Sequence, residues 1–531
     1  MNADLEQWRI EKAASASADG VVAAQHYLAA QAGAAMLAQG GNAVDAAVAA
    51  AFALAAVEPW MCGLGGSGFA VVHIGGVAEV VDFQGVLAAA ATPEAYPIDP
   101  DLPETIMGFP GVQGRKNTVG ASSATVPGAV AGLTSLSARF GRLGLDTLLA
   151  PAIALAERGL PVDWFATLQV ALCAADLAAD PGAARLYLPG GHPPQPETHL
   201  PLGALAATLR QLAEHGGPAL WSGPVGAALA ADLAAAGSLI TQDDLAGYTP
   251  LCYPAHAARH RDSVLYHAGP TSGGQRLADF LAHLEARLTP AAAPDGTAWG
   301  IVADGLDAAW AAHNLRIGRA PGRGGPASCT SSLSAVDADG SMVALTYTLL
   351  NRFGACWLSP RTGILMNNSV AYFDPRPGFP TSIAGAKRIN ASNMTPLVAT
   401  RNGTPIFALG ASGANHIMPA VAQIASLMLD FGMDLETAMN HPRIDASDRG
   451  SVRADPRLGA EVLAALAARG RVEIAQRLVF PKLYACPSGV ARDPLTGKAV
   501  GLNDPSQPMG GAAPAAPFAL SAKTDPAPQR P

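Results

Sequence analysis

A crowded group of hydroxyl side chains begins at Thr330, directly after a segment rich in glycine and proline. The stretch "GGPASCTSSLSAVD", residues 324–337, places four hydroxyl residues in five positions and then alternates like a strand. A threonine hydroxyl is a weak nucleophile unless a base lies beside it, and the α-amino group of a chain terminus, with a pKa of about 8, is one such base. This chemistry requires a cut between Cys329 and Thr330. The loose segment 316–329 would then let the new terminus clear the site.

Two other interpretations of this stretch stay open. A loop rich in glycine and proline before a strand is common, and threonine is frequent in strands. Ser331 is a rival nucleophile, but it requires a cut one residue later.

A predicted hairpin places a second threonine beside the first. The segments "SSLSAVD" and "SMVALTYT" flank "ADG", and an Asp-Gly pair is a strong short-range hairpin signal. If Asp339–Gly340 form a two-residue turn, Thr330 faces Leu349 across the hairpin. Thr348 then lies within one residue of Thr330, at the open end.

The bulk composition excludes some classes of function. The chain has 531 residues, 50% of them hydrophobic and 14% charged, with a net charge of −8. Nucleic-acid-binding proteins need a basic face, so we expect no nucleic-acid partner. The N-terminus lacks the apolar core of a signal peptide. The longest apolar run, "AVDAAVAAAFALAAVEPW", predicts a buried helix, because a membrane span needs about 20 strongly apolar residues. We expect no membrane partner and a cytoplasmic location.

No cofactor or metal is predicted. The six cysteines are scattered without a C-x-x-C pair. In "HAARH", His256 and His260 would lie one helical turn apart, a spacing that can chelate a metal, but no glutamate lies between them to act as a base. A metal-dependent hydrolase that uses these histidines is kept as a rival hypothesis.

The order of predicted elements favours an α+β architecture. Residues 21–58 read as two helices separated by "QGGN", with Asn42 capping the second. Two strands, Phe69–Ile74 and Ala78–Phe83, form a hairpin, and residues 126–284 are mainly helical. The last third is rich in strands, and the segment 505–531, rich in proline and alanine, is predicted to be a disordered tail.

Many motifs in one order resemble the γ-glutamyltransferase family of N-terminal-nucleophile hydrolases. They run from about Val21 to about Asp504 and include "GGNAVDAAVAAAFALAAVEPWMCGLGGSGF", "TVPGAVAGL", "TQDDLAGY", "GPTSGGQ", "CTSSLSAVDADGSMVALTYT", "GILMNN", "ALGASGA" and "HPRID". The resemblance implies a four-layer αββα sandwich. It also implies self-cleavage into residues 1–329 and 330–531, a large and a small subunit that form one intertwined domain. A dimer of such processed pairs stays open.

The same resemblance assigns the catalytic residues. Thr330 matches the nucleophile, and Thr348 matches the threonine that supports it. Gly413 and Ala414 fall where the family has a glycine pair whose N–H groups form the oxyanion hole, and an alanine still offers its N–H. Substrates would be amides such as glutathione, with water or an amine as the acyl acceptor.

The residues that hold the glutamyl group in the family are altered here. The arginine that grips the α-carboxylate aligns with Gln84, and the acidic residue that meets the α-amino group aligns with Tyr372. In the two-serine clamp, Ser392 remains and Asn393 replaces the second serine. Ser332 stands where a histidine usually follows the nucleophile. A neutral amide cannot form the charge-assisted pair that a carboxylate favours.

This pattern suggests a different acyl group. "TLLNRFG" after the second threonine resembles oxamate amidohydrolase, which acts on a small amide acid. Asn351 and Arg352 in this motif are candidate substrate-binding residues, and Lys387 and Arg388 are further candidate cations. Our leading hypothesis is a self-processing amidohydrolase or acyltransferase, with hydrolysis favoured. The alternatives are oxamate hydrolysis and a non-catalytic, unprocessed family member.

Overall fold

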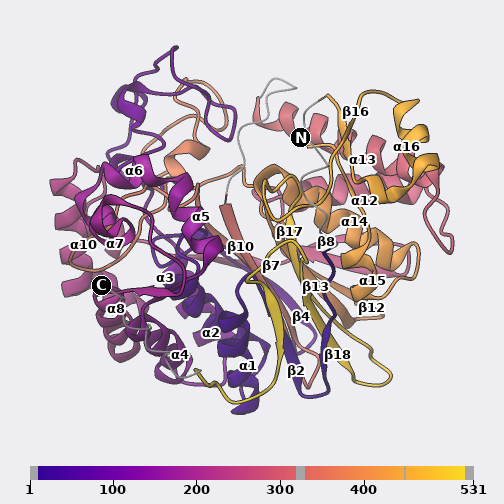
Figure 1. The fold of residues 1–531 in the computed structure, drawn as a ribbon, viewed down its shortest axis with the longest axis horizontal. Helices are drawn as coiled ribbons and strands as arrows, with labels where there is room; N and C mark the ends of the chain where they lie inside the picture. Colours follow the sequence, from indigo (N-terminus) through magenta and orange to yellow (C-terminus); the bar gives the residue numbers. More distant parts are fainter. Residues whose placement is uncertain (1–9, 319–328, 448–449, 521–531) are drawn as a thin grey trace, which may run out of the picture.

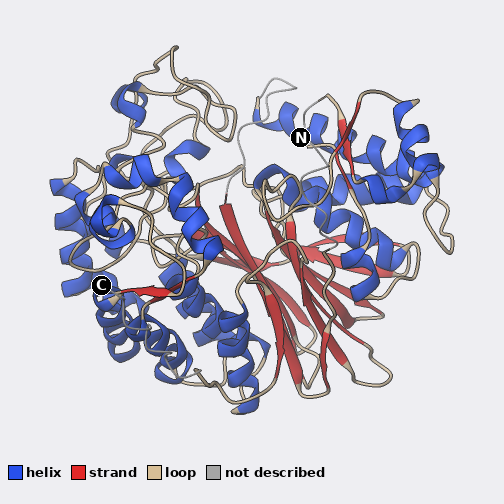
Figure 2. Ribbon diagram, in the orientation of Figure 1, coloured by secondary structure: helices blue, strands red, loops and turns tan. Residues whose placement is uncertain are grey.

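The chain folds into a four-layer sandwich of the αββα type. The computed structural model describes residues 10–318, 329–447 and 450–520. Two seven-stranded antiparallel sheets lie face to face, with helices on both outer sides (Figures 1 and 2). Val71, Ala344 and Val398 belong to the apolar cluster between the two sheets. The predicted α+β class and the αββα layering are confirmed.

Each sheet is named after a strand that ends near the site. The β10 sheet has the order β19 (Gly511–Pro514), β2 (Gly20–Ala24), β10 (Cys329–Asp337), β11 (Met342–Leu350), β3 (Ser67–Ile74), β4 (Val77–Phe83) and β7 (Leu251–Pro254). The β13 sheet has the order β1 (Ser15–Ser17), β18 (Ala499–Asn503), β17 (Cys486–Arg492), β13 (Thr404–Ser412), β12 (Leu397–Arg401), β9 (Ser263–His267) and β8 (His256–His260).

Helices of the first half lie outside the β10 sheet: α1 (Tyr27–Ala38), α2 (Ala43–Val57), α3 (Ala129–Phe140), α4 (Leu145–Arg158), α5 (Trp164–Leu172), α6 (Ala174–Ala178), α7 (Pro181–Tyr187), α8 (Gly203–His215), α9 (Gly217–Ser222), α10 (Pro224–Ala235) and α11 (Gln242–Ala246). Outside the β13 sheet lie α12 (Gly274–Arg287), α13 (Gly296–Ile317), α14 (Ile417–Leu429), α15 (Leu435–Asn440) and α16 (Ala460–Ala467). Two small sheets pair β5 (Leu160–Val162) with β6 (Thr198–Leu200), and β14 (Ile444–Asp445) with β15 (Val452–Ala454) and β16 (Val472–Ile474).

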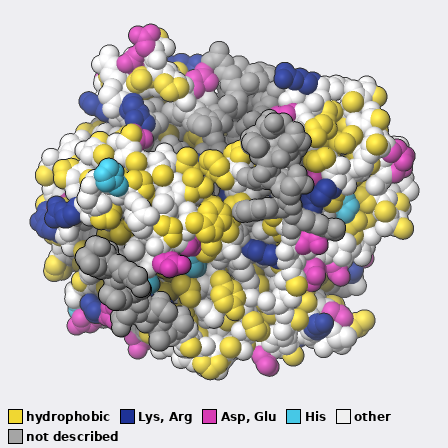
Figure 3. Space-filling view, in the orientation of Figure 1, with side chains coloured by type: hydrophobic (Ala, Val, Ile, Leu, Met, Phe, Trp, Pro, Cys, Tyr) yellow, Lys and Arg dark blue, Asp and Glu magenta, His cyan; other side chains and the backbone are white. Residues whose placement is uncertain are grey.

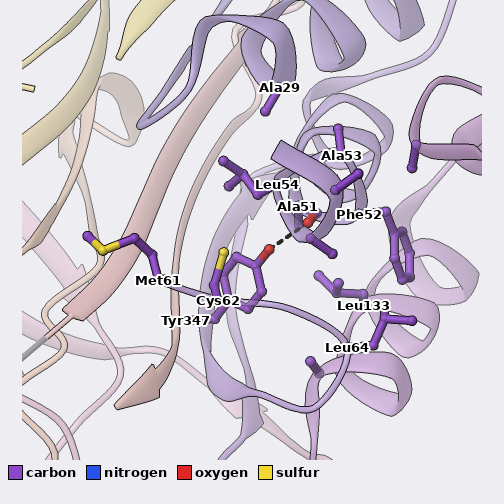
Figure 4. Close-up of a cluster of buried hydrophobic side chains, with 14 of the residues drawn as sticks. Ala29, Ala51, Phe52, Ala53, Leu54, Met61, Cys62, Leu64, Leu133 and Tyr347 are labelled. Carbon is purple, nitrogen blue, oxygen red and sulfur yellow. Dashed lines mark hydrogen bonds between the residues drawn. The ribbon is translucent and has the colours of Figure 1, made fainter. Parts of the chain in front are cut away.

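The alanine-rich helix α2 is buried along its whole length, as predicted. Asn42 caps it through a reciprocal capping box with Asp45. Small side chains permit close packing, since a Cβ on Gly33 of α1 would lie 2.5 Å from the Ala46 carbonyl oxygen. The Tyr347 hydroxyl of β11 donates to the Ala51 carbonyl at 2.5 Å, which ties the sheet to α2 (Figure 4). The first helix was predicted to start at residue 21 but begins at Tyr27, because residues 21–24 belong to strand β2.

The β10–β11 hairpin exists, but its register differs from the prediction by one residue. Ser332 pairs with Thr346, and the loop has three residues, 338–340, ending at Gly340 with φ 86°. The two-residue turn was therefore wrong, because a glycine with positive φ closes the longer loop. A register shift between Cys329 and Ser331 leaves Thr330 opposite both Thr348 and Leu349. The predicted proximity of the two threonines is confirmed.

The predicted disordered tail is wrong for residues 505–520. Strand β19 pairs with β2 from Gly511 to Pro514, and Gln507 is buried. Small residues suit this edge strand, and proline is tolerated at a sheet edge. Residues 521–531 lie outside the described part of the chain. The segment 316–329 was predicted to be loose, and its residues 319–328 also lie outside the described part. The prediction was wrong at both ends, because residues 316 and 317 complete helix α13 and Cys329 already belongs to β10.

The surface carries few charges, in agreement with the composition. On the face shown in Figure 3, the charged side chains of the described residues lie in small groups dispersed among apolar and uncharged ones. In the described ranges, no helix has the length and apolar character that a membrane crossing requires.

Candidate active site

Thr330 and Thr348 meet at the open end of the β10–β11 hairpin, around one carbonyl group. The Thr348 hydroxyl donates to the Cys329 carbonyl oxygen at 2.5 Å, and the Thr330 hydroxyl lies 2.8 Å from the same oxygen. The two Oγ1 atoms are 3.5 Å apart. The Leu350 N–H donates to Thr348 Oγ1 at 2.8 Å, so the second threonine is held in place. The peptide between Cys329 and Thr330 is thus polarised by a hydroxyl, with another hydroxyl beside it.

Gly413 and Ala414 lie at the end of β13, across the inter-sheet space from the hairpin. Gly413 has φ 129°, and a Cβ there would lie 2.8 Å from the Ala485 Cα, so this position requires glycine. Ala414 takes φ 53°, which is strained for a residue with a Cβ. Ser412 and Gly413 line the same cavity as Cys329. The structure therefore brings Gly413, one of the two expected oxyanion-hole residues, to the cavity that Cys329 lines, and Ala414 directly follows it in the chain.

A small cavity of about 20 Å³ adjoins Cys329. Its volume suffices for about one water molecule. Arg352, Lys482 and His416 line it, and the Arg352 guanidinium donates to Gln169 Oε1 at 2.7 Å. Two cationic side chains, Arg352 and Lys482, therefore line the cavity beside Cys329, and Arg352 was among the predicted substrate-binding residues.

Gln84 lies two strands away from Thr348, in line with it across the β10 sheet. Ser67 pairs with Thr348, and Gly68 pairs with Phe83, which brings Gln84 alongside Ser67. Both amide atoms of Gln84 and the Ser67 hydroxyl are buried, with no hydrogen-bond partner among the described residues. With strands about 4.8 Å apart, Gln84 lies roughly 10 Å from Thr348. Its buried amide therefore lies near the site without a partner among the described residues, but it does not line the cavity beside Cys329.

Two of the other residues expected in the altered clamp, Ser392 and Tyr372, contact each other, whereas Asn393 contacts Asn415. The Ser392 hydroxyl accepts from the Met394 N–H at 3.3 Å and also bonds Tyr372. Burial raises the pKa of Tyr372 to about 12, so this side chain is a neutral phenol at pH 7. Asn393 Nδ2 donates to Asn415 Oδ1 at 2.6 Å, while its own Oδ1 is buried without a partner among the described residues.

Asn351, Lys387 and Arg388 are among the sequence candidates that do not line the cavity. The Asn351 N–H donates to Asn368 Oδ1 at 3.0 Å, and this residue lies beside Arg352 rather than on the cavity wall. The Lys387 ammonium donates to the Ser382 carbonyl at 2.7 Å. Arg388 donates to the Gln84 carbonyl and to the Tyr248 hydroxyl, each at 2.9 Å. The side-chain donors of Lys387 and Arg388 bind protein oxygens, so neither of these two cations reaches the threonine pair.

The helical spacing assumed for His256 and His260 was wrong. Both lie on strand β8, where residues four apart are roughly 13 Å apart instead of one helical turn. The His256 ring stacks on His267, and His260 lies between Asp430 and Glu285, at 3.0 and 3.1 Å. This geometry does not support the rival metal hydrolase.

Several residues near the threonines went unnoticed in the sequence. His416 Nδ1 lies 2.7 Å from Asp445 Oδ2; burial would raise the pKa of Asp445, but His416 and Ser447 lower it to about 2. The sequence fragments "GANH" and "HPRID" contain this pair, but no pattern in the sequence between them indicates that His416 and Asp445 are in contact.

Glu58, which directly follows α2, is fully buried and accepts from the Ser331 hydroxyl at 2.8 Å. Ser331 therefore faces away from Thr330, which argues against it as nucleophile.

Glu58 makes the stability of the fold depend on pH. Burial raises its pKa to about 7, although the Ser331 hydrogen bond and the Lys482 charge oppose the shift. Unfolding would return the pKa to 4.5, so the native carboxyl holds a proton that the unfolded chain releases between pH 4.5 and 7. Stability from this group is present below pH 4.5 and is lost as the pH rises through 7.

Between pH 5 and 8, we expect the unfolding free energy of the parent to fall by roughly 3 kcal/mol more than that of Glu58→Gln. Urea unfolding at the two pH values measures it. Glu214→Gln, at an exposed helix position, serves as the matched control and should leave the pH dependence unchanged. An identical pH dependence in Glu58→Gln and the parent would contradict the assignment.

A nucleophile candidate at the head of a central strand, in an αββα sandwich, defines the class of N-terminal-nucleophile hydrolases. Comparison with known proteins agrees with this class. The cephalosporin acylase from Bacillus halodurans has a similar fold, with a TM-score of 0.83 at 24% identity, over 97% of this chain and 99% of that one.

The sequence comparisons identify the family. The gamma-glutamyltranspeptidase family model matches residues 29–315 and 313–480. Acylase ACY 1 proenzyme of Pseudomonas sp. (strain V22) is 35% identical over 496 residues, 87% of this chain and 88% of the relative. Glutathione hydrolase proenzyme of Escherichia coli (strain K12) is 27% identical over 474 residues, 80% of each chain. The chain belongs to the gamma-glutamyltranspeptidase family and is one of its enzymes.

Proposed function

We propose that the chain is a self-processing amidohydrolase whose nucleophile, Thr330, becomes N-terminal by cleavage of the Cys329–Thr330 peptide. This proposal rests mainly on the contact of the Cys329 carbonyl oxygen with the hydroxyl groups of both Thr330 and Thr348. Thr330 Oγ1 attacks the carbonyl carbon while the Thr348 hydroxyl stabilises the oxyanion. Thr348 accepts the Thr330 proton and gives up its own in the same relay, which delivers one proton to the leaving nitrogen. The Cys329–Thr330 C–N bond then breaks, and an ester to Thr330 forms. Water then hydrolyses this ester and frees the amine.

The same groups serve turnover once the amine is free. The α-amino group of Thr330 takes the hydroxyl proton as Oγ1 attacks a substrate amide, and an acyl-enzyme forms. The N–H groups of Gly413 and Ala414 stabilise the oxyanion. Water, or an amine acceptor, releases the acyl group and regenerates the enzyme. Hydrolysis is the favoured outcome.

Intact-mass spectrometry and N-terminal sequencing of active protein test the proposal. We expect two chains, residues 1–329 and 330–531, with the second chain beginning Thr-Ser-Ser-Leu. Full activity in a single chain of 53.8 kDa would reject it. A single inactive chain would favour the non-catalytic alternative.

The acyl group that the site favours carries a carboxylate but no α-ammonium group. Arg352 and Lys482 line the cavity and would attract an anion, whereas the neutral phenol of Tyr372 replaces the acidic residue that binds ammonium in relatives. The acylase name of a relative that is 35% identical supports an acyl group other than γ-glutamyl. Glutathione-type substrates and a small amide acid such as oxamate stay as alternatives.

Two anilides that differ only in the α-amino group test this choice. We expect kcat/KM for glutaryl p-nitroanilide to exceed that for γ-glutamyl p-nitroanilide at least about tenfold, because an ammonium group would be buried without an anionic partner. Equal values, or a preference for the γ-glutamyl compound, would contradict the proposal, as would efficient turnover of oxamate alone.

Arg352→Gln separates charge recognition from general damage. This variant should lower kcat/KM for the glutaryl compound about 10- to 100-fold and leave the uncharged butyryl anilide within about threefold, because only the former loses a charge-assisted bond. Lys387→Gln, a cation bound to the Ser382 carbonyl, is the matched control and should behave like the parent.

A further inference from the structure

Two cysteines from different parts of the chain lie together beside Arg352. Cys173 directly follows α5, and Cys356 lies in the loop after β11. Both thiols donate to the Arg352 carbonyl oxygen, at 3.8 and 3.7 Å. When Cys173 is ionised, Cys356 is within reach to donate to its sulfur instead. Both are free cysteines. Because the two sulfur atoms share one acceptor and lie within hydrogen-bond reach of each other, they are placed to react.

The two thiols differ in reactivity. The hydrogen bond from Cys356 lowers the pKa of the Cys173 thiol, with help from the Arg352 charge and against burial. The pKa of Cys356 is raised, by Cys173 and by burial. Cys173 is half-buried and Cys356 is buried. A partly accessible thiol with a lowered pKa is the one that attacks an external disulfide, and the buried thiol is placed to resolve the product.

We propose that Cys173 and Cys356 form a redox pair that closes to a disulfide between the two parts of the chain. The oxidant is a low-molecular-weight disulfide such as oxidised glutathione. The Cys173 thiolate attacks its S–S bond, which releases one glutathione thiol and leaves a mixed disulfide. Cys356 then loses its proton and attacks the Cys173 sulfur, which releases the second glutathione. Two cysteines lose two electrons and two protons, and one external disulfide becomes two thiols.

The position of the pair gives this bond a consequence. Cys173 lies in residues 1–329 and Cys356 in residues 330–531. If the proposed cleavage at Thr330 occurs, the disulfide therefore joins the large and small subunits covalently, and only this consequence rests on the proposed function. The bond would also fix α5, which carries Gln169, to the loop that carries Arg352.

Oxidation of the processed protein tests the proposal. Protein treated with oxidised glutathione and then alkylated should run on a non-reducing gel as one band of the summed mass. Dithiothreitol should return the two subunits. Peptide mapping should find Cys173 linked to Cys356. Cys173→Ser and Cys356→Ser should each abolish the linked band, whereas Cys252→Ser, which removes an exposed thiol on β7, should leave it unchanged.

The outcomes separate this proposal from the cleavage. Recovery of alkylated Cys173 and Cys356, under conditions that modify Cys252 fully, would overturn the redox pair. So would a bond from Cys173 to Cys329, whose thiol is also near. Peptide mapping of the single-chain variant Thr330→Ala detects the Cys173–Cys356 bond without any cut. A linked peptide in protein that never matures would keep the pair and reject the cleavage.

Discussion

Thr330→Ala should leave the protein as one uncut chain of about 53.8 kDa without measurable turnover. The variant lacks the hydroxyl that lies 2.8 Å from the Cys329 carbonyl oxygen, so neither the ester nor the free amine can form. We expect a loss of about 10⁴-fold or more in kcat, as for other catalytic nucleophiles. A denaturing gel after purification and an anilide assay measure the two effects.

Two neighbouring substitutions control this result. Thr330→Ser keeps a hydroxyl and should still mature, more slowly. Ser331→Ala removes the hydroxyl that contacts Glu58 on the other side of the strand, and it should mature at the cut before Thr330. Two chains from Thr330→Ala would exclude Thr330 as the attacking group, and failure of Ser331→Ala alone would move that role to Ser331.

Thr348→Val should slow maturation about 10²- to 10³-fold, the usual effect of removing one hydrogen bond to a developing oxyanion. The substitution keeps the shape of the side chain but deletes the donor 2.5 Å from the Cys329 carbonyl oxygen. It also removes the acceptor for the Leu350 N–H, at a residue with φ 82°. The time course of subunit appearance after expression, followed by mass spectrometry, gives the rate.

Thr346→Val is the matched control for this prediction. Thr346 lies two residues earlier on β11, on the same face, and its hydroxyl contacts Ser332 at 3.2 Å instead of Cys329. Maturation of Thr346→Val within about threefold of the parent would assign the effect to the contact with the carbonyl. Thr348→Val protein that matures at the parental rate would remove Thr348 from the mechanism.

Much of the fold near the site could be predicted because it depends on local patterns. Asn42 marks the start of α2, since its side chain satisfies the first backbone donors of the helix. Alternation of side chains after Thr330 indicated a strand, and the Asp-Gly signal indicated the hairpin that brings Thr348 back. The register was wrong by one residue, because a third loop residue and the shift at Cys329 depend on packing as well as on turn chemistry.

The sequence by itself determined the family motifs and the nearness of the two threonines, and it predicted neutral residues, Gln84 and Tyr372, in the substrate clamp. Only the tertiary structure decided what surrounds them. Glu58 reaches Ser331 across 273 positions of the chain, and Cys173 reaches the Arg352 carbonyl across 179. Such contacts form because the sheets and helices bury polar groups against whatever partners the topology brings near. Patterns of two or four residues carry no information at that separation.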